Sequence, residues 1–150
     1  MNPVQKIINL GMRWLAKKLV PFLQNTPFFY GQHSIEIGKN VSLSNVILNA
    51  RSGNISIADE VIFGHNCMVL TGIHDISAHA RKRDTIEDAN RNVVIGKNVW
   101  IASGVIIIGL VNIGKNSVIG AGSVVTKDVP ESVLAEGVPA KTLKTLVEIT

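Results

Sequence analysis

The sequence has little cysteine, few aromatic residues and few charges. Cys67 is the single cysteine in 150 residues, so the chain cannot build a disulfide framework. Only 5% of the residues are aromatic and 17% are charged. We find no secretory signal and no uninterrupted apolar run of transmembrane length. These features lead us to expect a cytoplasmic protein of one domain.

The charge balance is positive but not concentrated. Fifteen Lys and Arg residues face eleven Asp and Glu residues, which gives a formal net charge of +4. Such a balance suits nucleic acid, an anionic membrane or an anionic small ligand. Because the chain has no dense basic run with interleaved aromatic residues, we expect no nucleic-acid partner.

What the sequence does contain is a six-residue repeat between residues 95 and 130, which reads IGKNVW, IASGVI, IIGLVN, IGKNSV, IGAGSV, VTKDVP. The first position is always aliphatic: Ile95, Ile101, Ile107, Ile113, Ile119 and Val125. The fifth is always small or β-branched: Val99, Val105, Val111, Ser117, Ser123 and Val129. A helical period would drift out of phase, and a period of two would make the third positions apolar as well. The repeat therefore predicts a parallel β-helix in which each hexad is a short strand followed by a corner.

The repeat extends towards the N-terminus with two interruptions. Ile37, Val41, Leu43 and Ile47 fit a first coil that begins near Ile35, and the pattern slips by two residues at 50–54. Ile57, Phe63 and Val69 are then expected to point inward, with Cys67 as a small inward residue. Residues 75–92 lack any period and predict an extended loop, of the kind that serves as a lid or arm. We therefore divide the chain into a helical segment at 1–30, a β-helix at 31–139 of four to five coils, and a C-terminal segment at 140–150.

Both ends of the chain predict helices. Apolar residues of the segment 4–23 fall near one stripe, and its cations lie mostly elsewhere. This amphipathic helix either covers one end of the solenoid or a neighbouring subunit, or lies on the inner face of a membrane. Residues 140–149, with Leu143, Leu146 and Val147 on one side, predict a short capping helix.

Three segments carry a resemblance to a known family. VWIASGVII, IGKNSVIGAGSVVTKDVP and EGVPAK are similar to segments of the hexapeptide-repeat acyltransferases. The resemblance implies left-handed coils, whereas the general preference for right-handed crossovers would predict the opposite. It also implies an acetyl-CoA-dependent O-acetyltransferase that acts on a sugar hydroxyl. Because the outer faces are flat and poor in charge, we expect a homotrimer.

Acyl transfer to an alcohol needs a base, and histidine suits this role. Of His33, His65, His74 and His79, only His74 ends a coil and starts the loop. The segment LTGIHD is similar to the place where maltose, galactoside and polysaccharide O-acetyltransferases of this family carry their catalytic histidine. The resemblance therefore implies that His74 is the general base. Asp75 either lies on the acceptor side of the site, where it orients the His74 imidazole, or only starts a turn.

The resemblance also implies where acetyl-CoA binds, in a groove between adjacent prisms. The matching positions are Ala102, Ser103, Ala121, Thr126 and Lys127, and Lys141 and Lys144 are candidates for the phosphates. Small residues at corners also suit the fold alone. The chain departs from many relatives at Gly109-Leu110, where they carry Pro-Gly.

The acceptor is less well defined. Ser44 and Asn45 lie near an acceptor-contacting position of the sugar acetyltransferases. The basic N-terminal segment is similar to acetyltransferases of capsule and O-antigen synthesis, which implies a role in cell-surface polysaccharide biosynthesis by analogy.

Two other functions stay open at this point. His74 and His79 reproduce a histidine spacing of the γ-type carbonic anhydrases, which are zinc lyases of the same fold. However, no histidine lies in the matching segment 36–39, and we expect no bound metal. A non-catalytic scaffold is the second alternative, and it leaves the loop 75–92 without a role.

Overall fold

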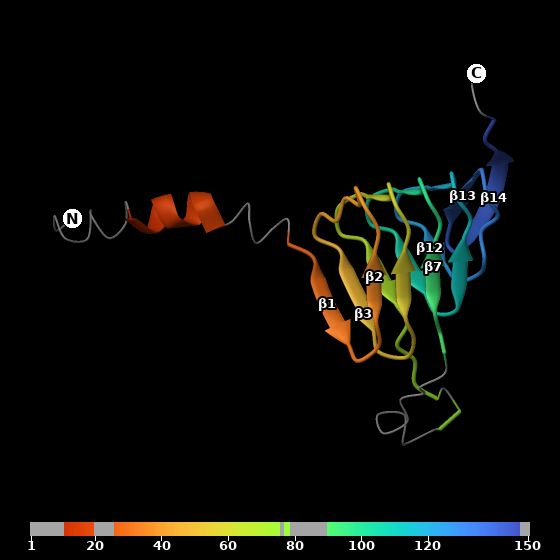
Figure 1. Cartoon of the computed structure of the whole chain (residues 1–150), viewed down its shortest axis with the longest axis horizontal. Coiled ribbons are helices and arrows are strands. Elements are labelled where there is room, and N and C mark those ends of the chain that lie inside the picture. Colours follow the sequence, from red (N-terminus) through yellow and green to blue (C-terminus); the bar gives the residue numbers. More distant parts are fainter. Residues whose placement is uncertain (1–10, 20–25, 76, 79–89, 148–150) are drawn as a thin grey trace.

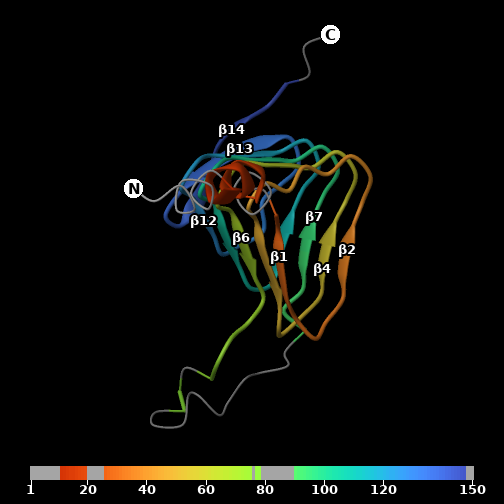
Figure 2. The ribbon, with the colours of Figure 1, turned by 90° about the vertical axis from the view of Figure 1, so that its left-hand side faces the viewer.

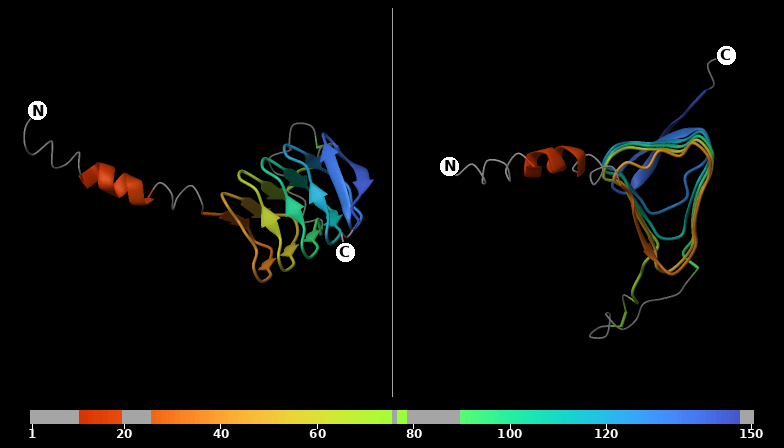
Figure 3. Two further views of the ribbon diagram at one scale, coloured as in Figure 1. Left: turned by 90° about the horizontal axis from the view of Figure 1, so that it is seen from above. Right: turned by 60° about the vertical axis from the view of Figure 1, so that its left-hand side comes forward.

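The chain folds into a parallel β-solenoid, seen from the side in Figure 1 and from the end at which β1 lies in Figure 2. Its cross-section is triangular (Figure 3, right). The computed structural model describes residues 11–19, 26–75, 77–78 and 90–147. The described strands stack in coils along one axis, from β1 at one end to β14 at the other (Figure 3, left). The predicted fold class, a left-handed parallel β-helix, is confirmed, with about five turns.

Three sheets form the faces of the prism. Sheet A contains β1 (Phe28–Gly31), β3 (Ile47–Ala50), β6 (Met68–Leu70), β9 (Ile106–Ile108) and β12 (Val124–Val125). Sheet B contains β2 (Ile35–Ile37), β4 (Ile55–Ile57), β7 (Val93–Ile95) and β10 (Val111–Ile113). Sheet C contains β5 (Ile62–Phe63), β8 (Trp100–Ile101), β11 (Val118–Ile119), β13 (Val133–Gly137) and β14 (Ala140–Thr145). Each pairing is parallel except that of β13 with β14.

The aliphatic positions of the repeat fill the interior of the prism. All six first positions and all six fifth positions between Ile95 and Val129 are buried. The pairing register stacks each first position on the next coil, as in Ile57 on Ile95 and Ile95 on Ile113. Because one inward side chain repeats at every corner and strand, the core is a continuous column of Ile and Val.

Three edges join the faces, and each is named here by the sheets it connects. The A–B edge comprises 32–34, 51–54, 71–75, 90–92, 109–110 and 126–128. The C–A edge comprises 44–46, 64–67, 102–105 and 120–123. The B–C edge comprises 38–41, 58–61, 96–99, 114–117 and 130–132. The loop 75–92 begins and ends on the A–B edge, at the bottom corner of the triangle in Figure 3, right.

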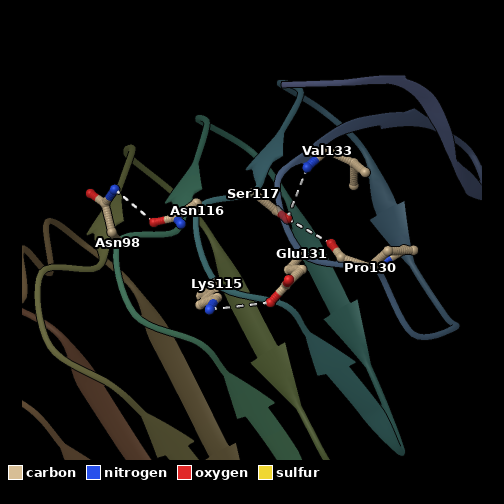
Figure 4. Close-up of polar contacts among 7 residues, drawn as sticks. All are labelled: Asn98, Lys115, Asn116, Ser117, Pro130, Glu131 and Val133. Carbon is tan, nitrogen blue, oxygen red and sulfur yellow. Dashed lines mark hydrogen bonds and ion pairs between the residues drawn. The ribbon is translucent and has the colours of Figure 1, made fainter. Parts of the chain in front are cut away.

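The B–C edge shows how the sequence makes its corners. Its left-handed positions fall at Asn40, Glu60, Asn98, Asn116 and Ser132, each with a φ between 52° and 62°. Asparagine tolerates this conformation better than most residues, which explains the recurring GKN triplet. Neighbouring coils are tied there by the bond from Asn98 Nδ2 to Asn116 Oδ1 (3.1 Å) and by the ion pair of Lys115 with Glu131 (3.5 Å; Figure 4). Buried Ser117 donates to the carbonyl of Pro130 at 2.7 Å.

The first coil differs from the expected one at two points. It starts earlier, because β1 pairs with β3 from Phe28↔Ile47 to Gly31↔Ala50. Its inward residue on sheet A is the fully buried Leu48, whereas Ile47 is only partly buried and lies on the outer side. The step from Leu43 to Leu48 is one residue short of a hexad, so the expectation for Ile47 was wrong.

The expected C-terminal helix is also wrong. Residues Ala140–Thr145 form strand β14, which runs antiparallel to β13 and closes sheet C. Leu143 stays exposed, and Leu146 donates its N–H to the carbonyl of Ser132 at 2.7 Å. The open edge of β13 offers unpaired backbone groups, and pairing with them outweighs the helical spacing of Leu143, Leu146 and Val147.

Part of the expected N-terminal helix lies within the described residues. Residues 11–19 are helical, and all nine are exposed, whereas 4–10 and 20–23 lie outside the described range. Met12, Leu15 and Leu19 follow helical spacing, and Lys18 Nζ lies 4.8 Å from the ring centre of Trp14. No helix in the described part of the chain is long and apolar enough to cross a membrane.

Candidate active site

The A–B edge carries the candidate base at the outgoing root of the loop. His74 is exposed, and it follows Ile73 directly after the coil that contains β6. Its backbone is therefore connected to a rigid prism, while its side chain faces outward. This placement agrees with the geometry that a general base requires, because the imidazole can reach a bound molecule.

Buried Ser52 holds both roots of the loop. Its N–H donates to Thr71 Oγ1 at 3.0 Å, and its Oγ accepts the N–H of Ile73 at 3.3 Å. Its carbonyl accepts the N–H of Arg91, on the returning root, at 2.9 Å. Thr71 is also fully buried, and its hydroxyl donates to the carbonyl of Asn49 at 3.0 Å. Ser52 lies in the two-residue slip at 50–54, so this interruption of the repeat fixes the position from which His74 emerges.

Asp75 belongs to the turn that follows His74. Its Oδ1 accepts the N–H of Ser77 at 2.8 Å and the hydroxyl of Ser77 at 2.5 Å, and its carbonyl accepts the N–H of Ala78 at 3.3 Å. The side-chain and backbone hydrogen bonds from Ser77 lower the pKa of the Asp75 carboxyl. This geometry is the turn-starting alternative, because the carboxylate is engaged by its own loop.

The C–A edge holds a second group of candidate residues. Ser103 and Ala121 are exposed there, and Ala102 is half-buried. Ser103 Oγ accepts a hydrogen bond from the backbone N–H of His65 at 3.1 Å. Ser44 and Asn45, the acceptor candidates, lie on this edge too, where Asn45 Nδ2 is hydrogen-bonded to Asn66 Oδ1.

Glycine gives the C–A edge a shallow backbone surface. Gly104 and Gly122 have φ values of 72° and 67°, and they stack on adjacent coils. A Cβ atom added at Gly122 would have no neighbouring atom within 4 Å and would point into open space. A flexible chain with amide groups can approach the backbone closely at such a surface.

The remaining carrier candidates lie elsewhere. Thr126 and Lys127 are exposed and follow β12, on the A–B edge. They lie two coils from His74, which is on the order of 10 Å along the axis. Lys141 and Lys144 are exposed on β14, at the far end of sheet C.

The single chain therefore splits the candidate site. His74, Asp75 and Lys127 share the A–B edge, whereas Ser103 and Ala121 share the C–A edge, and the width of sheet A separates the two groups. One prism does not bring the candidate base to the candidate carrier groove.

Two other histidines and the cysteine lie within the described residues. His33 is half-buried, and its backbone N–H donates to the carbonyl of Ala50 at 3.1 Å. His65 is exposed on the C–A edge. His79 lies outside the described residues. Within the described ranges, no group of three or more His, Cys, Asp or Glu could hold a metal ion. Burial raises the pKa of the Cys67 thiol, which lies 3.2 Å from the carbonyl of Ala102.

Sequence reasoning missed Ser52, Thr71 and Arg91. Their contacts join residues 19 to 39 positions apart, and the repeat has no position that encodes them. The two-residue slip at 50–54 was the one signal available, because an interruption of a strict repeat needs a local cause.

Comparisons with known proteins agree with this architecture. A family model described as bacterial transferase hexapeptide (six repeats) matches residues 92–127. The galactoside O-acetyltransferase of Lactococcus lactis is 39% identical over 115 residues, which cover 75% of this chain and 55% of the relative. The chain thus spans little more than half the length of this relative.

Solved structures give a closer match in length. A maltose O-acetyltransferase from Clostridium difficile is 34% identical, with a TM-score of 0.64, and the match covers 82% of this chain and 68% of that protein. A hexapeptide-repeat acetyltransferase from Vibrio cholerae, solved with acetyl coenzyme A, is 29% identical with a TM-score of 0.71. That match covers 82% of this chain and 71% of the other.

Proposed function

Because this chain belongs to the hexapeptide-repeat acetyltransferases, we propose that it transfers an acetyl group from acetyl-CoA to a sugar hydroxyl. The observation that carries the proposal is the position of His74, exposed on a coil end that buried Ser52 fixes. The zinc-lyase and scaffold alternatives have no comparable support, because the similar proteins named above are acetyltransferases.

In this mechanism His74 acts as the general base. Its imidazole accepts the proton of the acceptor hydroxyl while the hydroxyl oxygen attacks the thioester carbonyl. The tetrahedral intermediate collapses, the carbon–sulfur bond breaks, and the CoA sulfur leaves with a proton returned from the imidazolium. The products are the acetyl ester and free CoA.

Ser103 and Ala121, with Ala102 beside them, are proposed to line the carrier groove on the C–A edge. Thr126 and Lys127 contact the carrier from the A–B edge, and Lys141 and Lys144 are candidates for its phosphates. The exposed ammonium groups suit phosphate, since charge-assisted hydrogen bonds are stronger than neutral ones. Ser44 and Asn45 are proposed to contact the acceptor.

The split between the two edges supports a shared site in a homotrimer. In a closed ring, one surface of each chain meets a different surface of the next. If sheet A faces the symmetry axis, the A–B edge of one chain meets the C–A edge of its neighbour, which brings a His74 to a Ser103. The outer side of sheet A is apolar, with Phe28, Ile47, Met68, Ile106 and Val124 in one row, so its burial would stabilise the ring.

We place this reaction in cell-surface polysaccharide biosynthesis in the cytoplasm. We also propose that the N-terminal helix contacts an anionic membrane surface. Met12, Leu15 and Leu19 are exposed in the helix, Arg13, Lys17 and Lys18 supply positive charge, and no acidic residue precedes Glu36 in the sequence. An apolar stripe with flanking cations suits the boundary of a bilayer.

The chemical proposal is tested with His74→Ala. We expect kcat with acetyl-CoA and a panel of sugars to fall by about 10²- to 10⁴-fold, with little change in acetyl-CoA affinity. Free thiol release follows the reaction, and buried Cys67 should add little background. A folded His74→Ala protein with near wild-type turnover would remove the mechanism.

Mixed oligomers test the shared site. His74→Ala and Ala121→Trp should each be inactive as pure proteins, because one lacks the base and the other fills the groove. After the two are unfolded together and refolded, random assembly should restore about a quarter of the sites, since an intact A–B edge then meets an intact C–A edge. Refolding each variant alone is the control. Absence of recovery in a confirmed mixed trimer would show that each site belongs to one chain.

A further inference from the structure

Arg91, on the returning root of the loop, is wedged between coils. Its backbone N–H donates to the carbonyl of Ser52. Its backbone also packs on Gly53, where an added Cβ would meet the Arg91 carbonyl carbon at 2.5 Å. Its guanidinium lies on Gly109, where an added Cβ would meet Nη2 at 1.8 Å. Gly109 has a φ of 80°, so this position has neither the space nor the backbone conformation for another residue. The departure at Gly109 from the Pro-Gly of many relatives thus makes room for this arginine.

The guanidinium has no counter-ion among the residues that the structure describes. Arg91 is half-buried, and its Nε is buried without a hydrogen-bond acceptor. The ion pairs found in the described ranges, Lys97 with Glu60 and Lys115 with Glu131, both lie on the B–C edge. A positive charge that is partly removed from water without a partner is unfavourable. Packing against Gly109, and not charge pairing, holds this cation in place.

The surroundings of Arg91 are positive. Arg51 and Lys127 lie on the same A–B edge. The two acidic residues of that edge are engaged elsewhere, because Asp75 accepts from Ser77, and Asp128 Oδ1 accepts the N–H of Asn112 at 2.7 Å. Among the described residues of this edge, an anion near Arg91 therefore meets two further cations, and both carboxylates are already hydrogen-bonded.

We propose that Arg91 binds an anionic group of the acyl acceptor, a carboxylate or a phosphate. The acceptor is then an acidic sugar or a sugar phosphate, and it contacts His74 through its hydroxyl. Ser52 is hydrogen-bonded to both roots of the loop, to Ile73 directly before His74 and to Arg91 itself. Ser103 and Ala121 lie on the opposite side of sheet A. The planar guanidinium can donate two parallel hydrogen bonds to either group. The assignment of the ligand as the acceptor rests on the proposed function; the anion site itself does not.

Binding and turnover are measured separately on the full chain. Glucose 1-phosphate, glucuronate and neutral glucose serve as probes, with binding followed by titration calorimetry and turnover by thiol release. We expect the two anions to bind more tightly than glucose, and Arg91→Gln to weaken them by about 10- to 100-fold without changing glucose or acetyl-CoA. Lys39→Gln removes an exposed cation from the B–C edge and is the matched control, with an expected effect of less than about threefold.

Gly109→Ala provides a second route to the same outcome. It displaces the guanidinium but keeps the charge, so anion binding should weaken while the net charge is unchanged. Equal losses for glucose and the anions, or a loss of acetyl-CoA affinity alone, would overturn the proposal. Anion binding that depends on Arg91 in a protein without acetyl transfer would contradict the proposed function and leave the anion site standing. Acetyl transfer at equal rates to neutral and anionic sugars would contradict the anionic acceptor and leave the proposed function standing.

Discussion

Ser52 Oγ accepts the N–H of Ile73 at 3.3 Å, and this bond fixes the residue directly before His74. Ser52 is fully buried and also contacts Thr71 and Arg91, so one side chain and its backbone link two coils to both roots of the loop. Ser52 and Ile73 lie 21 positions apart in the sequence. Precision of a catalytic group depends on such supporting contacts, because a small misplacement reduces the rate steeply.

Ser52→Ala should therefore affect catalysis more than folding. It leaves the Ile73 N–H without its acceptor, which costs about 1 to 3 kcal/mol of the free energy of unfolding. We expect kcat to fall about tenfold or more, with an unchanged KM for acetyl-CoA, since His74 loses its fixed position. Ser56→Ala, on the outer side of sheet B, is the control and should change neither quantity. Equal kcat values for the two variants would show that Ser52 supports stability alone.

The hexads from residue 95 onward show how far a sequence can predict this fold. Every first and fifth position is buried as expected, because a strict period places each residue at the same point of the triangle in every coil. Burial of Ser117 and Ser123 at fifth positions is also accommodated, since their hydroxyls donate to the carbonyls of Pro130 and Gly120.

The prediction failed where the period breaks. A five-residue step puts Leu48 inside in place of Ile47, and both residues are aliphatic, so composition could not choose between them. Residues 140–145 have the spacing of a short helix, but the free edge of β13 captures them as a strand. Local patterns are weak wherever an unpaired strand edge competes for the same residues.

The sequence named the candidate site residues one by one, and their roles stay predictions. Exposure of His74 at a coil end follows from the repeat and the loop, and the sequence shows both. That Ser103 and His74 lie on different edges depends on the corner at which the chain re-enters the prism after the loop 75–92, which the repeat alone does not show. The role of Ser52 depends on contacts across coils, which no local pattern encodes.

The column of aliphatic residues should dominate stability. Ile107→Ala removes a fully buried side chain from sheet A and should lower the free energy of unfolding by about 2 to 5 kcal/mol. Val94, on the outer side of sheet B, is 42% exposed, so Val94→Ala should cost under about 1 kcal/mol. Urea denaturation of both variants measures the difference. Equal destabilisation by the two variants would show that the buried column does not dominate stability.

The N-terminal helix should bind anionic vesicles in a charge-dependent manner. Arg13→Gln with Lys17→Gln should weaken binding to vesicles of phosphatidylglycerol by about 1 kcal/mol for each cation removed. Pure phosphatidylcholine vesicles should bind weakly before and after the change. Lys39→Gln with Lys97→Gln, on the B–C edge, is the control and should leave binding intact. Vesicle co-sedimentation that treats both double variants alike would argue against a specific role of the helix.

The pH dependence should separate Asp75 from His74. The bonds from Ser77 lower the pKa of Asp75, so the ionised carboxylate stabilises the turn. For a lowered pKa, that stabilisation is present above the unfolded value and is lost only as the pH falls through the folded one, below about 4. Between pH 7 and 5 Asp75 remains ionised, so a loss of rate in that range does not arise from this carboxylate. Asp75→Asn should therefore leave the acid limb of kcat against pH unchanged in position, even if the turn loosens and the rate falls. A limb that shifts in Asp75→Asn would instead show that this carboxylate interacts with the His74 imidazole during catalysis.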